Sequence, residues 1–276
     1  MSYKRFTIVA GKTVITRMTD STLIKMEKGR RPKTNPTSAA VAKINKLNQE
    51  RELTAKLNAN FRPGDWWITL SNQIGVTVEE SMEKIAKLKR GLQRYCKKNE
   101  LPYRMVEAMG VGQIKGKVHH HIVLNKEIPI EMVYKYWAEE EVFAQPLKGY
   151  NYQKVAAYIL KNAEESKDKR GRYTKAFRSS RQVVKPEQRV EEMKRAATYD
   201  IEDLKPRKGY QIDRDSIRMY DHPITGVACL EYIEVSTEPE PRIKYYYRGK
   251  PAKWEPLYPP GLPEQVSIDE ILYGGA

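Results

Sequence analysis

The chain contains the segment VHHHIVL at residues 118–124, with three consecutive histidines followed by apolar and β-branched residues. Side chains point alternately to the two faces of a strand, so His119 and His121 share one face and His120 lies on the other. Two imidazoles two residues apart on one face can bind a single divalent metal ion. The segment therefore predicts a strand with a candidate metal site, and ordinary surface histidines or an adventitious site are the alternatives.

The residues before this strand predict its hairpin partner. Tyr103–Met109 reads as a strand, and three glycines between residues 110 and 116 indicate the connecting loop. Glu107 lies on that first strand, and a hairpin closed by residues 110–117 is expected to bring its carboxylate beside the histidines. Glu107 is therefore a candidate third metal ligand, and a solvated strand carboxylate is the alternative.

A second candidate group lies in NYQKVAAYILKNA, residues 151–163. At about 100° per residue, Lys154, Tyr158 and Lys161 share one side of a helix and the apolar residues take the other. A phenol, with an ordinary pKa of about 10, is a poor nucleophile, but a nearby ammonium favours the phenolate and a metal on the phosphate lowers the repulsion of the incoming oxygen. Taken alone, the pattern fits an amphipathic helix with a half-buried tyrosine better than a nucleophile. Together with the histidine pair upstream, the pattern predicts that Tyr158 is a nucleophile.

Further elements extend outward from these two segments. WWITLS, residues 66–71, is rich in aromatic and β-branched residues and predicts a strand. Thr77 and Glu80 form the T-x-x-E capping box of a helix over residues 78–98. Helices are also expected at 38–60, 129–139, 151–162 and 187–198, and a short strand at 141–145. Strands and helices joined by hairpins as well as crossovers indicate an α+β fold.

Composition limits the classes of protein that fit. The formal net charge of +15 favours a polyanionic partner, because neutralised phosphates release condensed counterions. Two cysteines, Cys96 and Cys229, form no CxxC pair, which argues against a zinc ribbon or a disulfide framework and fits a reducing compartment. No run of 18 apolar residues indicates a membrane span, and the first residues lack a secretory apolar region. We therefore expect a cytoplasmic protein without a membrane partner.

A basic segment follows the tyrosine helix. From Lys167 to Arg181 there are seven basic residues and one acid, with Tyr173 and Phe177 interleaved, which suits phosphate contacts and base stacking on DNA. A solvated basic loop is the alternative. Lys154 on the preceding helix is a further candidate. The candidate DNA contacts are therefore Lys154, Lys169, Arg170, Arg172, Lys175, Arg178 and Arg181. A weaker candidate is KGRRPK at residues 28–33.

Three of these segments, in this order, resemble motifs of the HUH-superfamily replication initiators of phages and plasmids of Gram-positive bacteria. WWITLS is similar to the first motif. HHHIVL is similar to the second, although His120 stands where an apolar residue is usual, and YILK, residues 158–161, is similar to the third. The resemblance covers roughly residues 40–190. It implies a central antiparallel sheet of about five strands flanked by helices. We accordingly expect a basic helical N-terminal arm at 1–60, an HUH endonuclease core at 61–185 and a C-terminal extension of unknown role at 186–276.

The resemblance also implies a mechanism. His119 and His121, with Glu107, would hold Mg²⁺ or Mn²⁺ against the scissile phosphate. Tyr158 would attack single-stranded DNA at a replication-origin hairpin, leaving a 5′-phosphotyrosine and a 3′-OH for a host polymerase, while Lys161 stabilises charge. GVGQIKGK at residues 110–117 lacks the spacing of a phosphate loop, so a host helicase would unwind the duplex.

Three other functions remain open at this stage. Relaxases and some transposases share the chemistry, but relaxases usually place the tyrosine before the histidines, and here it follows them. A basic DNA-binding protein without catalysis would use the histidines structurally. A metal-dependent hydrolase would use water as the nucleophile in place of Tyr158.

Overall fold

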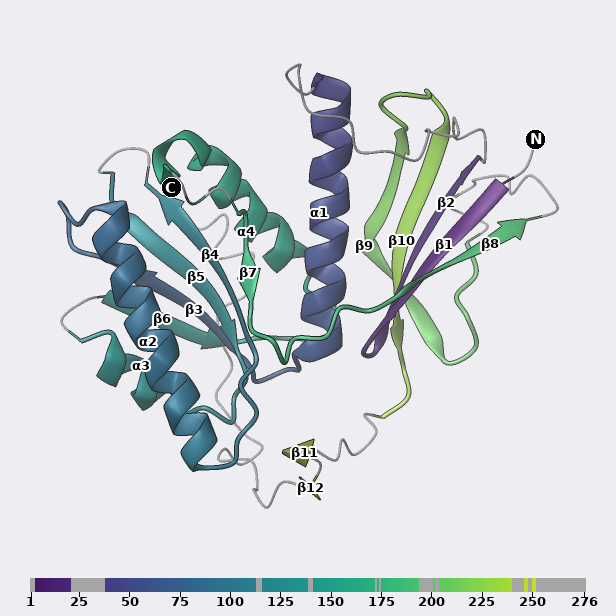
Figure 1. Ribbon diagram of the computed structural model, residues 1–276. Coiled ribbons are helices and arrows are strands. Elements are labelled where there is room, and N and C mark those ends of the chain that lie inside the picture. The colour runs from purple at the N-terminus through teal and green to yellow at the C-terminus, as the bar shows by residue number, and fades with distance from the viewer. Residues whose placement is uncertain are drawn as a thin grey trace.

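The computed structural model describes residues 3–20, 38–112, 116–138, 141–171, 173, 175–193, 201, 204–239, 246–247 and 250–251. Over these residues the chain has four α-helices and two five-stranded antiparallel sheets with helices packed against them (Figure 1). The expected α+β class is confirmed, and so is a five-stranded antiparallel sheet flanked by helices. The second sheet was not expected.

The first sheet has the strand order β6-β3-β5-β4-β7. Its strands are β3 (Trp66–Ser71), β4 (Met105–Val111), β5 (Val118–Leu124), β6 (Glu141–Pro146) and β7 (Arg178–Ser179). The segments predicted as strands at 66–71 and 118–124 have the expected bounds, and β4 begins two residues later than predicted. Because β5 lies between β3 and β4, six of its seven residues are buried.

Helices cover both faces of this sheet. On one face α2 (Val78–Lys98) and α3 (Ile130–Tyr136) pack against alternate strand residues such as Ile68 and Ile122. On the other face α1 (Ala39–Asn60) and α4 (Gln153–Glu165) enclose Trp67 and Val123, and a short 3-10 helix η1 (Lys167–Arg170) follows α4. The predicted capping box of α2 is present, with Thr77 and Glu80 bonding reciprocally. The sheet thus separates two cores, one on each side.

The second sheet pairs strands near the N-terminus with strands from residues 188–236. It has the order β8-β1-β2-β10-β9. Its strands are β1 (Tyr3–Ala10), β2 (Thr13–Asp20), β8 (Gln188–Met193), β9 (Tyr210–Asp221) and β10 (Ala228–Ser236), and a separate two-stranded ladder pairs β11 (Tyr246–Tyr247) with β12 (Lys250–Pro251).

Two predictions are therefore wrong. Within the expected N-terminal arm, residues 39–60 are helical, but residues 3–20 form a hairpin around Gly11, whose φ of 60° suits a tight turn. The helix expected at 187–198 is a strand over Gln188–Met193, because that segment pairs with β1 through six residues. The rest of that predicted helix lies outside the described residues.

Helix α1 connects the two sheets. Its buried Leu53 and Leu57 pack in the core with α4, and Ala55 packs against Ile8 and Ile15 of the second sheet. Figure 1 shows α1 between the two sheets. The position of α1 thus sets how the second sheet sits beside the helix that carries Tyr158.

Candidate active site

The two histidines predicted to act together do share one face of β5. The His119 and His121 ring centroids are 4.9 Å apart, and both rings lie on the α4 side of the sheet. His120 lies on the opposite face against α2, where it is fully buried. The alternation of side chains along the strand therefore separates the histidines as the sequence predicts.

Nδ1 of each imidazole has a hydrogen-bonding neighbour. Nδ1 of His121 is 3.1 Å from Thr69 Oγ1, and Nδ1 of His119 is 3.4 Å from the Lys117 carbonyl oxygen. A carbonyl only accepts, so Nδ1 of His119 carries the hydrogen and Nε2 carries the lone pair. Nε2 of His121 is buried without a hydrogen-bond partner. Metal-ligating histidines use this arrangement, with one nitrogen held by a neighbour and the other free.

Burial keeps both imidazoles neutral. It is the main cause that lowers the pKa of His119, and it lowers the pKa of His121 to about 3, with the neighbouring His119 adding to the effect. A metal ion binds the neutral form of imidazole. The orphaned buried nitrogen and the neutral rings together fit a divalent metal ion.

Two neighbours set the orientation of the rings. Trp67 of β3 stacks on His121 with ring centroids 5.5 Å apart and planes 5° apart. Gly110 of β4 lies directly across from His119 in the antiparallel register, and a Cβ at that position would overlap the His119 ring. The bare backbone at residue 110 is therefore what makes room for this imidazole.

Helix α4 brings the predicted nucleophile to the imidazoles. The Tyr158 ring centroid is 5.0 Å from that of His121 and 6.0 Å from that of Trp67. The helix is anchored by the apolar arc expected from its sequence, all of which is buried: Val155, Ala156, Ile159, Leu160 and Ala163. Burial raises the pKa of Tyr158, so the phenol keeps its proton at neutral pH unless a bound cation or substrate changes its surroundings.

Asn162 is a site residue that the sequence reasoning missed. It lies four residues after Tyr158, and its Nδ2 donates to the Tyr158 carbonyl oxygen at 3.0 Å. That bond fixes which end of the amide faces the backbone, and so leaves Oδ1 for the site. Burial dominates the pKa shifts of His119, His121 and Tyr158, and the Asn162 amide opposes it in all three. The i, i+4 spacing from the tyrosine was the available signal.

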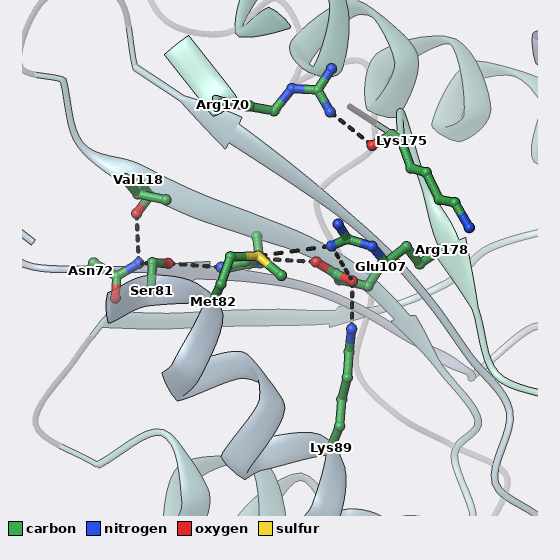
Figure 2. A network of polar contacts seen from close by, with 10 residues as sticks. Asn72, Ser81, Met82, Lys89, Glu107, Val118, Arg170, Lys175 and Arg178 are labelled. Carbon is green, nitrogen blue, oxygen red and sulfur yellow. Dashed lines mark hydrogen bonds and ion pairs between the residues drawn. The ribbon is translucent and has the colours of Figure 1, made fainter. Parts of the chain in front are cut away.

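Glu107 is not beside His119 and His121, so its expected role as third ligand is wrong. Its cross-strand partner is Ile122, which shares a face with His120. The Glu107 carboxylate accepts from Lys89 at 2.6 Å and lies 3.0 Å from Nδ1 of His120 (Figure 2). Although burial acts in the opposite direction, these two partners lower the pKa of Glu107 to about 2.

On the face of the sheet opposite His119 and His121, Glu107 belongs to a buried polar network. Nε2 of His120 is 2.8 Å from Ser81 Oγ, and Asn72 Nδ2 donates both to Ser81 Oγ at 2.7 Å and to the Val118 carbonyl at 2.9 Å (Figure 2). A serine, a histidine and a carboxylate in a row resemble a hydrolase triad. Ser81 and His120 are fully buried, however, and no substrate could reach them. The network instead holds the middle of β5 in place.

The basic segment divides between structural and exposed side chains. Arg170 is only 3% exposed and donates to the Lys175 carbonyl at 2.8 Å, so its expected DNA contact is wrong. Arg178 lies on the α2 face, 3.9 Å from Glu107.

The exposed candidates are Lys154, Lys161, Lys169, Lys175 and Arg181. Lys154 also forms an ion pair with Asp215 at 3.4 Å. Arg172 and the KGRRPK segment lie outside the described residues.

Other searches give no identification. Comparisons with protein-family models, with curated proteins and with solved structures returned no significant match. Within the described ranges, no group of three or more His, Cys, Asp or Glu side chains gathers at one point. Among the described helices, none is both long enough and apolar enough to cross a membrane.

Proposed function

We propose that this chain is a metal-dependent, single-tyrosine endonuclease of the HUH class, which nicks single-stranded DNA to start rolling-circle replication. One observation carries the proposal: Tyr158 and His121, from distant segments, meet with ring centroids 5.0 Å apart. The orphaned Nε2 of His121 gives independent support, because a buried unpartnered nitrogen calls for a ligand.

His119 and His121 would hold Mg²⁺ or Mn²⁺, with the oxygen of Asn162 on the same side. A divalent ion in this position would polarise the scissile phosphate and offset its negative charge. A ligand set of two imidazoles and one oxygen suits several divalent metals, and an oxygen ligand favours Mg²⁺ or Mn²⁺. Thr69 and the Lys117 carbonyl would keep the imidazoles in the binding tautomer.

Tyr158 would perform the covalent step. Its oxygen forms a bond to phosphorus while the bond from phosphorus to the 3′ oxygen breaks. The phenol proton passes to water, and the departing 3′ oxygen takes up a proton to become the free 3′-OH. The DNA 5′ end stays on Tyr158 as a phosphotyrosine. Lys161, exposed one turn after Tyr158, can approach a bound phosphate and stabilise the charge that develops.

The test is covalent capture. Labelled single-stranded DNA carrying inverted-repeat sequences is incubated with the full chain and Mn²⁺, and adducts are resolved under denaturing conditions. We expect an adduct that disappears in Tyr158→Phe and His121→Ala and persists in Tyr152→Phe. Tyr152 is a suitable control because it lies at the start of the same helix, with its hydroxyl on the Gly149 carbonyl.

Two other outcomes would favour the competing functions. Cleavage that persists in Tyr158→Phe indicates a hydrolase that uses water. DNA binding without cleavage, across divalent metals and origin sequences, indicates a non-catalytic binding protein. The order of the motifs, histidines before tyrosine, favours an initiator over a relaxase, with an origin hairpin as the substrate and host helicase and polymerase as partners.

A further inference from the structure

A groove with a volume of about 740 Å³ lies between α2 and the β4–β7 edge of the first sheet, on the face opposite Tyr158. Figure 2 shows Lys89 and Arg178 reaching Glu107 from different elements. The charged side chains that line the groove are Lys89, Lys97, Glu107, Arg178 and Arg181. The proposed chemistry at Tyr158 uses none of them.

The groove is strongly cationic. Lys89, Gln93 and Lys97 are spaced by four residues on α2 and therefore present one face to the groove. Arg178 and Arg181 line the opposite wall, so four cations face one carboxylate. That carboxylate, Glu107, is 2% exposed and already paired with Lys89. The solvent-accessible part of the groove is therefore positively charged and suits an anion. Of the four cations, Lys97 and Arg181 are the exposed ones.

The groove is linked along the chain to the tyrosine helix. Helix α4 ends at Glu165, and the chain then passes through η1 to β7, which pairs with the outer side of β4. This connection carries exposed lysines at 167, 169 and 175. A basic path therefore leads from the helix that bears Tyr158, around the β7 edge, to the opposite face of the sheet.

We propose that this groove binds the phosphate backbone of the single strand that flanks the nick, so that the substrate wraps around the β7 edge of the sheet. The inference rests on the proposed function for the identity of the strand. A volume of this size suits a ligand of about two nucleotides. Phosphate contacts from lysine and arginine would bind it without reading its sequence.

The test is the salt dependence of DNA binding. Fluorescence anisotropy with labelled single-stranded DNA of about 30 nucleotides is measured at several salt concentrations, in the Tyr158→Phe chain so that no cleavage occurs. Each phosphate contact contributes about 0.7 to the slope of log affinity against log salt for single strands. The double variant Lys97→Gln/Arg181→Gln should therefore lower the slope by about 1.4.

The matched control removes two exposed lysines of α1, Lys43→Gln and Lys46→Gln, which lie away from the groove. An unchanged slope in this control, with a reduced slope in the groove variant, supports the groove. An equal reduction of the slope in both variants, or an unchanged slope in the groove variant, overturns the proposal. The slopes can differ as expected while the chain with Tyr158 intact forms no tyrosine adduct. That result supports the groove as a DNA-binding site and contradicts the proposed nicking function.

Discussion

Replacing Glu107 by glutamine separates the two roles that this residue could have. In the structure its carboxylate pairs with Lys89 at 2.6 Å and with His120 at 3.0 Å, and the three side chains are 2%, 25% and 0% exposed. Breaking a buried pair by removing one partner costs about 3–5 kcal/mol. Because Lys89 can turn towards solvent, we expect the lower end of this range, about 3 kcal/mol.

Urea unfolding measures this loss. With a slope near 3 kcal/mol per molar urea, the upper value for small proteins, the unfolding midpoint should fall by about 1 M. Calorimetric titration with Mn²⁺ below the transition supplies the second measurement. Because Glu107 lies on the face away from His119 and His121, Mn²⁺ affinity should be retained in Glu107→Gln and lost in His121→Ala. An unchanged midpoint with Mn²⁺ binding lost as in His121→Ala would refute the face assignment.

Three further predictions test the surroundings of the site and the fold. Thr69→Val removes the hydrogen bond to Nδ1 of His121 and should weaken Mn²⁺ binding by about 10–100-fold in calorimetric titration; an unchanged affinity would show that this bond does not orient the ring. Gly110→Ala places a methyl group against the His119 ring, so Mn²⁺ binding should fall while circular dichroism keeps the native spectrum; full Mn²⁺ affinity would contradict the close packing. Burial raises the pKa of Asp65 from 3.8 to about 7. The unfolded chain then loses this proton first as pH rises, so this group's contribution to stability is present below pH 3.8 and is lost as pH rises to about 7. The drop in the urea midpoint between pH 5 and 8 should be smaller in Asp65→Asn, and an equal drop in both proteins would contradict this.

Local signals predicted the elements that carry the site. The capping box of Thr77 and Glu80 marks the start of α2, and the aromatic and β-branched run at 66–71 marks β3. Helix α4 follows from the spacing of its apolar residues, which places Tyr158 off the apolar arc. These signals suffice because each depends on neighbours in sequence.

The face occupied by Glu107 could not be obtained in the same way. In a hairpin, a shift of one residue in register moves every side chain of a strand to the other face. The register that pairs Glu107 with Ile122 depends on how the loop of residues 112–117 closes. The sequence predicts that loop but not its geometry, so it does not settle which face of the sheet Glu107 occupies.

The second sheet was missed because its pairing is long-range. Gln188–Met193 has the sequence QRVEEM, which lacks alternation and contains helix-favouring residues. Its strand conformation follows from pairing with Tyr3–Ile8, 180 to 190 residues away. The hairpin of β1 and β2 likewise pairs with strands distant in sequence, β8 and β10.

Anomalous diffraction from crystals soaked in Mn²⁺ would locate the bound ion. We expect one strong peak at bonding distance from Nε2 of both His119 and His121, on the side of the sheet that faces Tyr158. A peak on the opposite face beside Glu107 and His120, or no peak at the imidazole pair at saturating Mn²⁺, would contradict this expectation.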